Sequence, residues 1–243
     1  MSVLDEEVEG WLSPDQAERL AARAAVLPAG ATIVEIGSFR GRSTIVLARA
    51  APPDARVVAI DPHAGGDRGP QEIAADAARG EADHAAFVAN LRRAGVADRV
   101  RHVRRPSQSA LGEVSGGIDL LYVDGAHRFW PALQDVARWG ARVRPGGTML
   151  VHDAFSSVGV TLAIMVRLMA GGEFAYAGRS RSLAEYRRLP EPLGARARLA
   201  NAAVQFAQLP WFARNVAIKL ALVSGRGGLA VALGHRRGDP WPY

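Results

Sequence analysis

The side chains best suited to chemistry follow two apolar runs, where Asp124 precedes His127 by three residues and His152 adjoins Asp153. Two carboxylates that end neighbouring strands can share a hard cation such as Mg²⁺. An imidazole beside them could also ligate the ion, and it favours Mn²⁺ or Zn²⁺. His127 suits proton removal, because an unperturbed imidazole has a pKa of about 6.5. Alternatively, the acids cap the helices that follow them and His127 is a surface residue.

A glycine loop and a separate acid form a second candidate site earlier in the chain. Gly37 and Gly41 stand four residues apart after an apolar run, so the backbone can pass close to a ligand at a helix N-terminus. Their spacing differs from the G-x-G-x-x-G of dinucleotide-binding proteins. Asp61 ends the next apolar run, well after Glu35, and an acid there can accept hydrogen bonds from a ribose diol. A tight turn is the alternative for the glycines, and a turn start before Pro62 is the alternative for Asp61.

The scarcity of lysine and the absence of cysteine limit the ligands and catalytic groups that the chain can have. Lys219 is the only lysine in the chain, so no lysine accompanies the glycine loop to bind a phosphate. The loop and Asp61 therefore favour an adenosine ligand without phosphates, S-adenosylmethionine, over ATP. The chain has no cysteine, which excludes disulfides, thiolate metal ligands and cysteine nucleophiles.

The elements that must position these residues alternate along the chain. Strands are predicted at the apolar runs 32–37, 56–61, 99–104, 118–124 and 148–153. Helices are predicted from Pro14 to about Leu27, behind a capping box of Ser13 and Gln16, and near 41–51, 82–94, 107–113, 128–143 and 157–170. The runs are apolar on both faces, as in a parallel sheet covered on both sides. This order predicts an α/β fold with a doubly wound, mostly parallel sheet, closed by a hairpin of 174–177 and 183–187.

The sequence changes character near residue 190. The 243 residues hold 30 Lys and Arg against 24 Asp and Glu, and most of the net charge of +6 lies in residues 191–243. We predict a catalytic domain at 1–190 and a basic helical C-terminal extension at 191–243, broken at Pro210 and at 225–228. The amphipathic segment 211–223 could dock on its own domain, a second subunit or an anionic membrane; packing on protein is favoured. No dense basic run with interleaved aromatics indicates nucleic-acid binding.

Other segments bear on location, assembly and substrate. The start of the chain is acidic and has no apolar signal region, and no run of about 18 apolar residues predicts a spanning helix. We expect a cytoplasmic protein and a homo-oligomer, a dimer, with 158–169 in the core or at a subunit interface. Residues 62–80 could form a lid over a ligand or a mobile insertion. Phe129 and Trp130 could form an apolar or sugar-stacking wall or a buried helix face.

The motif E-x-G-x-x-x-G, given in full by Glu35, Gly37 and Gly41, resembles that of class I S-adenosylmethionine-dependent methyltransferases. Over roughly residues 10–187 the chain is similar to the metal-dependent O-methyltransferase branch, which includes catechol O-methyltransferase and macrolide-sugar O-methyltransferases. The resemblance implies a Rossmann-like methyltransferase fold, a loop that holds the methionine part of the cofactor, and ribose binding by Asp61. The pair Ser107-Gln108 resembles the Ser-Gln pair that contacts adenine. The implied cofactor contacts are Glu35, Gly37, Ser38, Gly41, Ser43, Asp61, His63, Ser107, Gln108 and Asp124.

The resemblance also implies a metal and a base. Asp124 and Asp153 fall on the metal-binding positions of that branch. His152 departs from the branch's pattern, because relatives that have a pair of polar residues at this site often have two acids. The catechol enzyme has an Asn directly after its Asp, and Ala154 cannot replace that Asn. His152 could ligate the metal, shift the preference from Mg²⁺ towards Mn²⁺ or Zn²⁺, or weaken metal binding. His127 stands where the catechol enzyme has its catalytic lysine and where some sugar O-methyltransferases have a base histidine.

We therefore predict an O-methyltransferase that moves the methyl of S-adenosylmethionine to a hydroxyl, with a divalent metal and His127 as base. A small-molecule or saccharide acceptor is expected. The D-x-x-H pattern resembles that of sugar-modifying relatives and favours a sugar or glycoside; a phenolic or polyketide hydroxyl is the alternative. An NAD-dependent oxidoreductase is disfavoured by the glycine spacing. A non-catalytic, membrane-docked protein that keeps cofactor binding is the remaining alternative.

Overall fold

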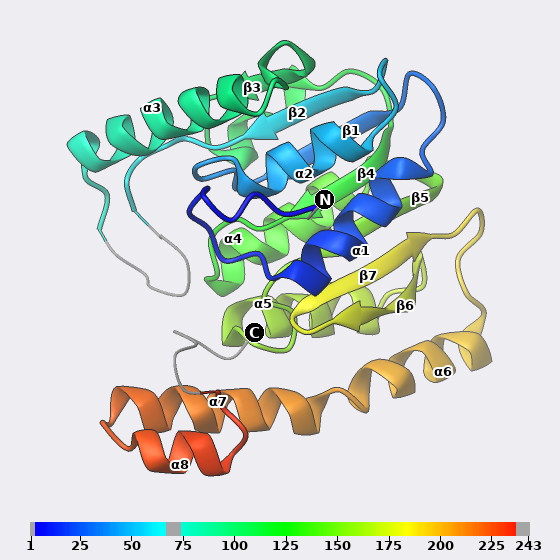
Figure 1. The fold of residues 1–243 in the computed structure, drawn as a ribbon. Helices are drawn as coiled ribbons and strands as arrows, with labels where there is room; N and C mark the ends of the chain where they lie inside the picture. The colour runs from blue at the N-terminus through cyan, green and yellow to red at the C-terminus, as the bar shows by residue number, and fades with distance from the viewer. Residues whose placement is uncertain (1–2, 67–73, 237–243) are drawn as a thin grey trace.

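A seven-stranded sheet forms the centre of the molecule in a computed structural model that describes residues 3–66 and 74–236 (Figure 1). The strand order is β3-β2-β1-β4-β5-β7-β6. The first five strands run parallel, whereas β7 lies antiparallel to β5 and β6 antiparallel to β7. The prediction of a doubly wound, mostly parallel sheet with a closing hairpin is confirmed.

The strands lie where the apolar runs predict them. They are β1 (Thr32–Ile36), β2 (Arg56–Ile60), β3 (Val100–Val103), β4 (Ile118–Val123), β5 (Val143–Val151), β6 (Phe174–Ser180) and β7 (Leu183–Arg188). Strand β5 begins five residues before its predicted start at 148. Its pairing with β4 is irregular between Ile118 and Leu120, where residues 144–147 of β5 face Asp119 alone. Gly146 has φ +79°, a conformation that costs glycine little, so the strand continues through a bulge.

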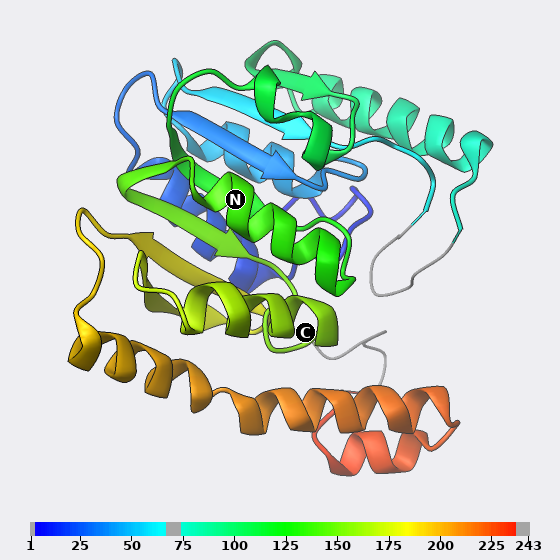
Figure 2. The same cartoon turned by 180° about the vertical axis from the view of Figure 1, so that it is seen from behind.

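Helices cover both faces of the sheet (Figures 1 and 2). One face carries α1 (Pro14–Ala25), α2 (Arg42–Ala50) and α3 (Ala77–Arg93). The other carries α4 (Phe129–Gln134) and α5 (Val158–Ile164), each continued by a π-helical segment. Each face has its own apolar cluster: Ile33 and Leu120 belong to the first, Val34 and Leu121 to the second. These alternating side chains show why the strands are apolar on both faces.

Two predicted helices differ from the structure. Helix α3 begins at Ala77 rather than near residue 82, because Asp76 caps it by accepting a hydrogen bond from Arg79 N at 2.7 Å. The segment 107–113 forms two short 3₁₀ turns, Ser107–Ser109 and Leu111–Glu113. Serine and glycine are weak helix formers, so this segment does not sustain an α-helix.

The C-terminal helices follow the hairpin. They are α6 (Ala195–Phe206), α7 (Leu209–Val223) and α8 (Gly227–Ala232). Helix α6 packs against β6, and α8 packs against α7 (Figure 1). Asn201 of α6 accepts a hydrogen bond from Tyr176 N at 2.8 Å and donates one to Phe174 O at 3.1 Å, so its amide pairs with the edge strand β6. The predicted break at Pro210 is displaced: Pro210 lies in the first turn of α7, where its missing N–H costs nothing. The break predicted at 225–228 is shorter in the structure: the chain is non-helical at 224–226, and Gly227 and Gly228 begin α8.

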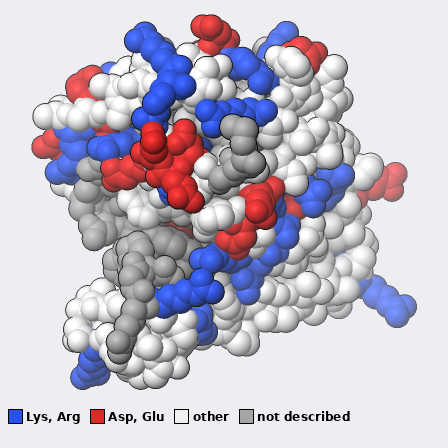
Figure 3. All heavy atoms as spheres, in the orientation of Figure 1, with Lys and Arg blue, Asp and Glu red and all other residues white. Residues whose placement is uncertain are grey.

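The surface supports the division of charge seen in the sequence. On the face that Figure 3 shows, acidic and basic side chains are interspersed over the part of the molecule where α1–α3 lie, whereas the part where α6–α8 lie is mainly uncharged with scattered basic groups. Exposed apolar side chains in the extension include Leu199, Leu220 and Val223. Among the described residues, no helix combines the length and the apolar character needed to cross a membrane.

Candidate active site

A cleft of about 660 Å³ opens at the carboxyl ends of the parallel strands. It spans the junction of β1 and β4, where the strand order reverses and where ligands bind in open α/β sheets. Its volume lies in the range of small-molecule sites, roughly 300–1,000 Å³. Predicted site residues in its lining are Gly37, Asp61, His63, Ser107, Gln108, Asp124, His127, His152 and Asp153.

The glycine loop joins β1 to α2 and approaches β4 closely. Gly37 has φ +84°, and a Cβ built there would lie 2.0 Å from the carbonyl oxygen of Asp124. Only glycine fits this position, which leaves the loop backbone open to the cleft. Gly41, with φ +89°, forms the N-cap of α2. The loop backbone therefore packs against the end of β4, and Gly37 also lines the cleft.

Four predicted cofactor contacts do not line the cleft: Ser38 and Gly41, which belong to the loop itself, and Glu35 and Ser43, which lie behind it. Glu35 is fully buried and accepts hydrogen bonds from the hydroxyls of Ser43 and Thr44. Burial raises the pKa of Glu35 to about 8, with the two hydroxyls opposing the rise. Glu35 and Ser43 therefore hold the start of α2 against β1, and support the loop from below.

Asp61 clamps the loop from the end of β2. Its Oδ2 accepts hydrogen bonds from Ser38 N and Phe39 N, both at 2.9 Å, and its Oδ1 accepts one from His63 N at 2.7 Å. His63 Nε2 lies 2.7 Å from Phe39 O, which ties the β2 turn to the same loop. The Asp61 side chain remains 17% exposed in the cleft, so a ligand can reach its carboxylate.

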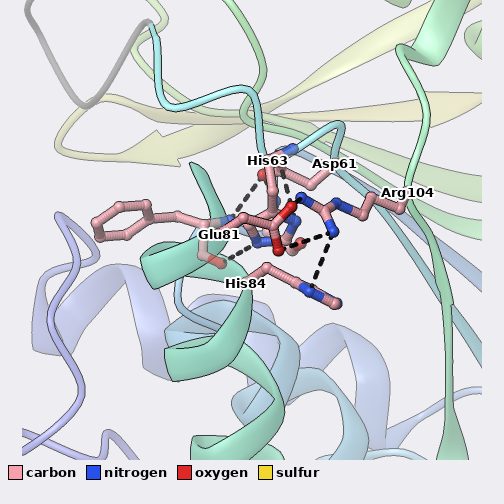
Figure 4. Close-up of polar contacts among 7 residues, drawn as sticks. Asp61, His63, Glu81, His84 and Arg104 are labelled. Atoms are coloured by element: carbon pink, nitrogen blue, oxygen red, sulfur yellow. Dashed lines mark hydrogen bonds and ion pairs between the residues drawn. The ribbon is translucent and has the colours of Figure 1, made fainter. Parts of the chain in front are cut away.

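Three histidine rings pack together behind this turn, and those of His84 and His102 are stacked. Rings of His63, His84 and His102 have centroids 5.0–5.3 Å apart. Burial, and then the neighbouring histidines, lower the pKa of His102 to about 4. Figure 4 shows Glu81 and His84 of α3 beside Asp61 and His63, with Arg104 paired to Glu81 and 3.4 Å from His84 Nδ1. The cluster packs α3 against the cofactor end of the sheet.

Ser107 and Gln108 line the cleft beside an acid that the sequence analysis missed. Asp135 accepts hydrogen bonds from the Ser107 hydroxyl and, at 3.5 Å, from Gln108 Nε2. Trp139 Nε1 donates to Ser107 O at 3.2 Å. Burial raises the pKa of Asp135 to about 6. A single acid on the apolar side of the predicted helix 128–143 was the available signal for this residue.

Asp124, His152 and Asp153 converge between β4 and β5. Each offers one ligand atom within 4.8 Å of the others. His152 Nδ1 lies 3.0 Å from Asp124 Oδ1 and 3.5 Å from Asp153 Oδ2. The other oxygen of Asp124 accepts a hydrogen bond from Tyr122 at 2.9 Å. Asp153 Oδ1 is buried and has no hydrogen-bond partner among the described residues, so the donor set fits a divalent cation.

The charges of this cluster shift its pKa values strongly. Burial lowers the pKa of His152, yet the carboxylates of Asp124 and Asp153 outweigh it and raise that pKa to about 10. Burial likewise opposes ionisation of Asp153, but His127 and His152 hold its pKa well below the usual range. Burial and Asp124 raise the pKa of Tyr122 well above its usual value, so its hydroxyl remains a donor.

His127 lies beside this cluster at the mouth of the cleft. Its Nε2 is 3.0 Å from Asp153 Oδ2, and its side chain is 15% exposed. Burial lowers its pKa, but the Asp153 carboxylate more than offsets this and raises it. Gly159 permits α5 to approach, because a Cβ there would lie 2.1 Å from His127 O. The structure thus places the predicted base and the predicted metal ligands together.

Two helices distant in sequence, α1 and α7, contact the His152–Asp153 pair or the turn that follows it. Gln16 of α1 lies behind His152, with Oε1 3.4 Å from the ring Nε2. In the turn after β5, Asp153 and Phe155 have φ +54° and +57°. Helix α7 holds this turn: Asn215 donates to Phe155 O at 3.3 Å and Lys219 to Ser156 O at 2.9 Å.

Aromatic side chains border the cleft. Trp130 is 66% exposed and lines it, so it does not form a buried helix face. Trp11 and Phe39, which the sequence analysis did not single out, also line the cleft, with their ring centroids 5.1 Å apart. Residues 62–66, 74 and 75 of the predicted lid also line the cleft, whereas 67–73 lie outside the described residues.

The chain is similar in sequence to known methyltransferases. Residues 34–154 match a family described as a methyltransferase domain. The chain is 36% identical over 124 residues to catechol O-methyltransferase of Mycobacterium tuberculosis; the match covers 50% of this chain and 46% of that protein, so the chain spans about half the length of this relative.

Solved structures share the fold. Cofactor-bound Rv0187 from MTB is 25% identical, with a TM-score of 0.52, 77% of this chain covered and 84% of that one. The O-methyltransferase TomG from Streptomyces achromogenes, involved in tomaymycin synthesis and solved with SAM, is 24% identical, with a TM-score of 0.52 and coverages of 74% and 82%. These likenesses confirm the predicted fold class.

Proposed function

Because the chain belongs to the class I S-adenosylmethionine-dependent methyltransferases, we propose that it is a metal-assisted O-methyltransferase. It transfers the cofactor's methyl group to a hydroxyl, with His127 as the base. The observation that carries this proposal is the convergence of Asp124, His152, Asp153 and His127 in one cleft with the glycine loop.

The cofactor fits along the strand ends. The Gly37 backbone, where a Cβ would clash, receives the methionine part, and the Asp61 carboxylate receives the ribose hydroxyls. Ser107, Gln108 and Asp135 border the adenine end.

A divalent cation, Mg²⁺ or Mn²⁺, would be held by Asp124, His152 and Asp153. The buried Asp153 Oδ1 offers it a ligand atom that no described donor occupies. When bound, the ion lowers the pKa of the acceptor hydroxyl and orients it. Tyr122 keeps Asp124 in place by donating to its second oxygen.

His127 removes the proton of the acceptor hydroxyl while Asp153 holds its ring and stabilises the imidazolium that forms. The hydroxyl oxygen attacks the methyl carbon in line with the carbon–sulfur bond. The new oxygen–carbon bond forms as the carbon–sulfur bond breaks, and the electron pair of that bond neutralises the sulfonium to give S-adenosylhomocysteine. His127 then returns its proton to solvent.

A sugar or glycoside is the proposed acceptor. The exposed Trp130 supports this class, because its ring offers a flat apolar wall beside His127 with room for a polar ligand. A phenolic or polyketide hydroxyl is the second candidate, favoured by the identity to catechol O-methyltransferase.

The test is a labelled-methyl transfer screen over sugar, phenol and lipid acceptors, with binding titrations of S-adenosylhomocysteine and NAD. Methylation of a saccharide supports the proposal, and methylation of phenols alone reassigns the acceptor. Binding of NAD without S-adenosylhomocysteine would overturn the cofactor assignment. Cofactor binding with no transfer to any acceptor would favour a non-catalytic role, which liposome flotation with and without residues 191–243 examines.

A further inference from the structure

The orientation of the Gln16 side-chain amide is fixed by its neighbours. Gln16 is fully buried in the first turn of α1. Its Oε1 accepts a hydrogen bond from Ser13 N at 2.9 Å, and its Nε2 donates one to Ser182 Oγ at 3.0 Å. A backbone N–H can only donate, so the atom that faces Ser13 N must be the oxygen.

This orientation determines which nitrogen of His152 carries the proton when the ring is neutral. His152 Nε2 lies 3.4 Å from the same Gln16 Oε1. Because that oxygen can only accept, Nε2 is the N–H side of the ring. The other ring nitrogen, Nδ1, faces Asp124 Oδ1 and Asp153 Oδ2 at 3.0 and 3.5 Å. In the neutral imidazole, Nδ1 therefore presents its lone pair to the space that the two carboxylates share.

We propose that Gln16 is a positioning residue for the metal site, which makes His152 Nδ1 a metal ligand beside Asp124 and Asp153. The inference rests on the proposed metal-assisted function and deepens it. Ligating histidines commonly donate their second N–H to an oxygen acceptor, which fixes the tautomer and raises ligand basicity. With one imidazole among its ligands, the site takes Mn²⁺ in preference to the all-oxygen ion Mg²⁺.

The residues that orient His152 lie outside the part of the chain that matches the methyltransferase family. Gln16 precedes the residues 34–154 that match the methyltransferase family, and Ser182 follows them. Gln16 Oε1 therefore has two roles. It accepts the capping hydrogen bond from Ser13 N at the start of α1, and it orients the buried His152 ring, 136 residues away.

The test compares three variants by Mn²⁺ affinity in the cofactor-free protein, measured from the electron paramagnetic resonance signal of free Mn²⁺. Gln16→Met keeps the length of the side chain but removes the acceptor, and we expect affinity to fall about 10–100-fold. Gln16→Glu accepts from both Ser13 N and His152 Nε2, and should bind at least as tightly as the natural protein. Ser13→Ala is the matched control, because it removes the hydroxyl that bonds Asp15 but keeps the backbone N–H.

The possible outcomes distinguish a failure of this inference from a failure of the proposed metal-assisted function. Equal Mn²⁺ affinity in Gln16→Met and the natural protein overturns the role of Gln16 and leaves the metal in place. Absence of Mn²⁺ binding in the natural protein overturns both the metal and this inference. Should Gln16→Met not fold, spin-echo modulation on the Mn²⁺-loaded natural protein with ¹⁵N-labelled histidine decides: nitrogen coupling to Mn²⁺ is expected, and its absence overturns the assignment.

Discussion

Replacing Glu35 by Gln is expected to change how the stability of the protein depends on pH. The Glu35 carboxyl is fully buried under the glycine loop, and burial raises its pKa from 4.5 to about 8. Between those two pH values the unfolded chain loses a proton that the folded protein keeps. The free energy of unfolding therefore falls as pH rises through this window, and is unaffected by this group below and above it. A shift of this size corresponds to about 5 kcal/mol in total.

The Gln variant has no such proton to lose, so it provides the reference. The assay is urea unfolding of both proteins at pH 5, 6, 7 and 8 in the presence of EDTA. The difference between their free energies of unfolding isolates Glu35, because the titrations of the other groups cancel. The stability of the natural protein relative to Glu35→Gln should fall by about 1.4 kcal/mol per pH unit. Parallel profiles would refute the reasoning, since they would mean that Glu35 ionises equally in both states. Glu18→Gln, at an exposed position of α1, controls for the loss of one carboxyl group.

Four further changes test the site. His127→Ala should lower kcat at least about 100-fold while calorimetry shows nearly unchanged S-adenosylhomocysteine affinity; retained turnover removes the base role. EDTA should stop methyl transfer and Mg²⁺ or Mn²⁺ restore it, whereas indifference to EDTA removes the metal from the mechanism. Asp61→Ala should weaken cofactor binding about tenfold or more, because it removes both the ribose acceptor and the clamp on two loop amides, each worth about 1 kcal/mol; unchanged affinity contradicts the assignment. Gly37→Ala should cost at least about 1–2 kcal/mol of stability from its φ of +84° alone, and urea unfolding equal to the natural protein would contradict the close approach to Asp124.

The arrangement of the sheet was predictable because its signals are local. Each parallel strand is a short apolar run that ends in a polar residue, and parallel strands place their carboxyl ends at one edge. Asp61, Asp124 and Asp153 were identified on that basis, and the cleft lies at that edge. The bulge in β5 was not predictable, because a Pro-Gly-Gly sequence at 145–147 is equally typical of a turn.

The parts of the site that escaped prediction depend on contacts distant in sequence. The capping pattern identified Gln16 as a helix-start residue, but nothing local indicates that His152 lies behind it. Glu35 carries the family motif, yet the structure places it behind the loop with Ser43 rather than in the cleft. The helical pattern marks Asp135 as a lone acid on an apolar side, but nothing local indicates that it holds Ser107.

The amide of Asn201 has a consequence for fragments of this protein. Strand β6 is the outermost strand on its side of the sheet, and the Asn201 side chain occupies backbone groups there that would otherwise be open. A fragment ending near residue 190 would keep every proposed active-site residue but would present a bare strand edge. Such edges recruit strands from other chains. The fragment should therefore self-associate, so its activity would be limited by aggregation even where its cleft is complete.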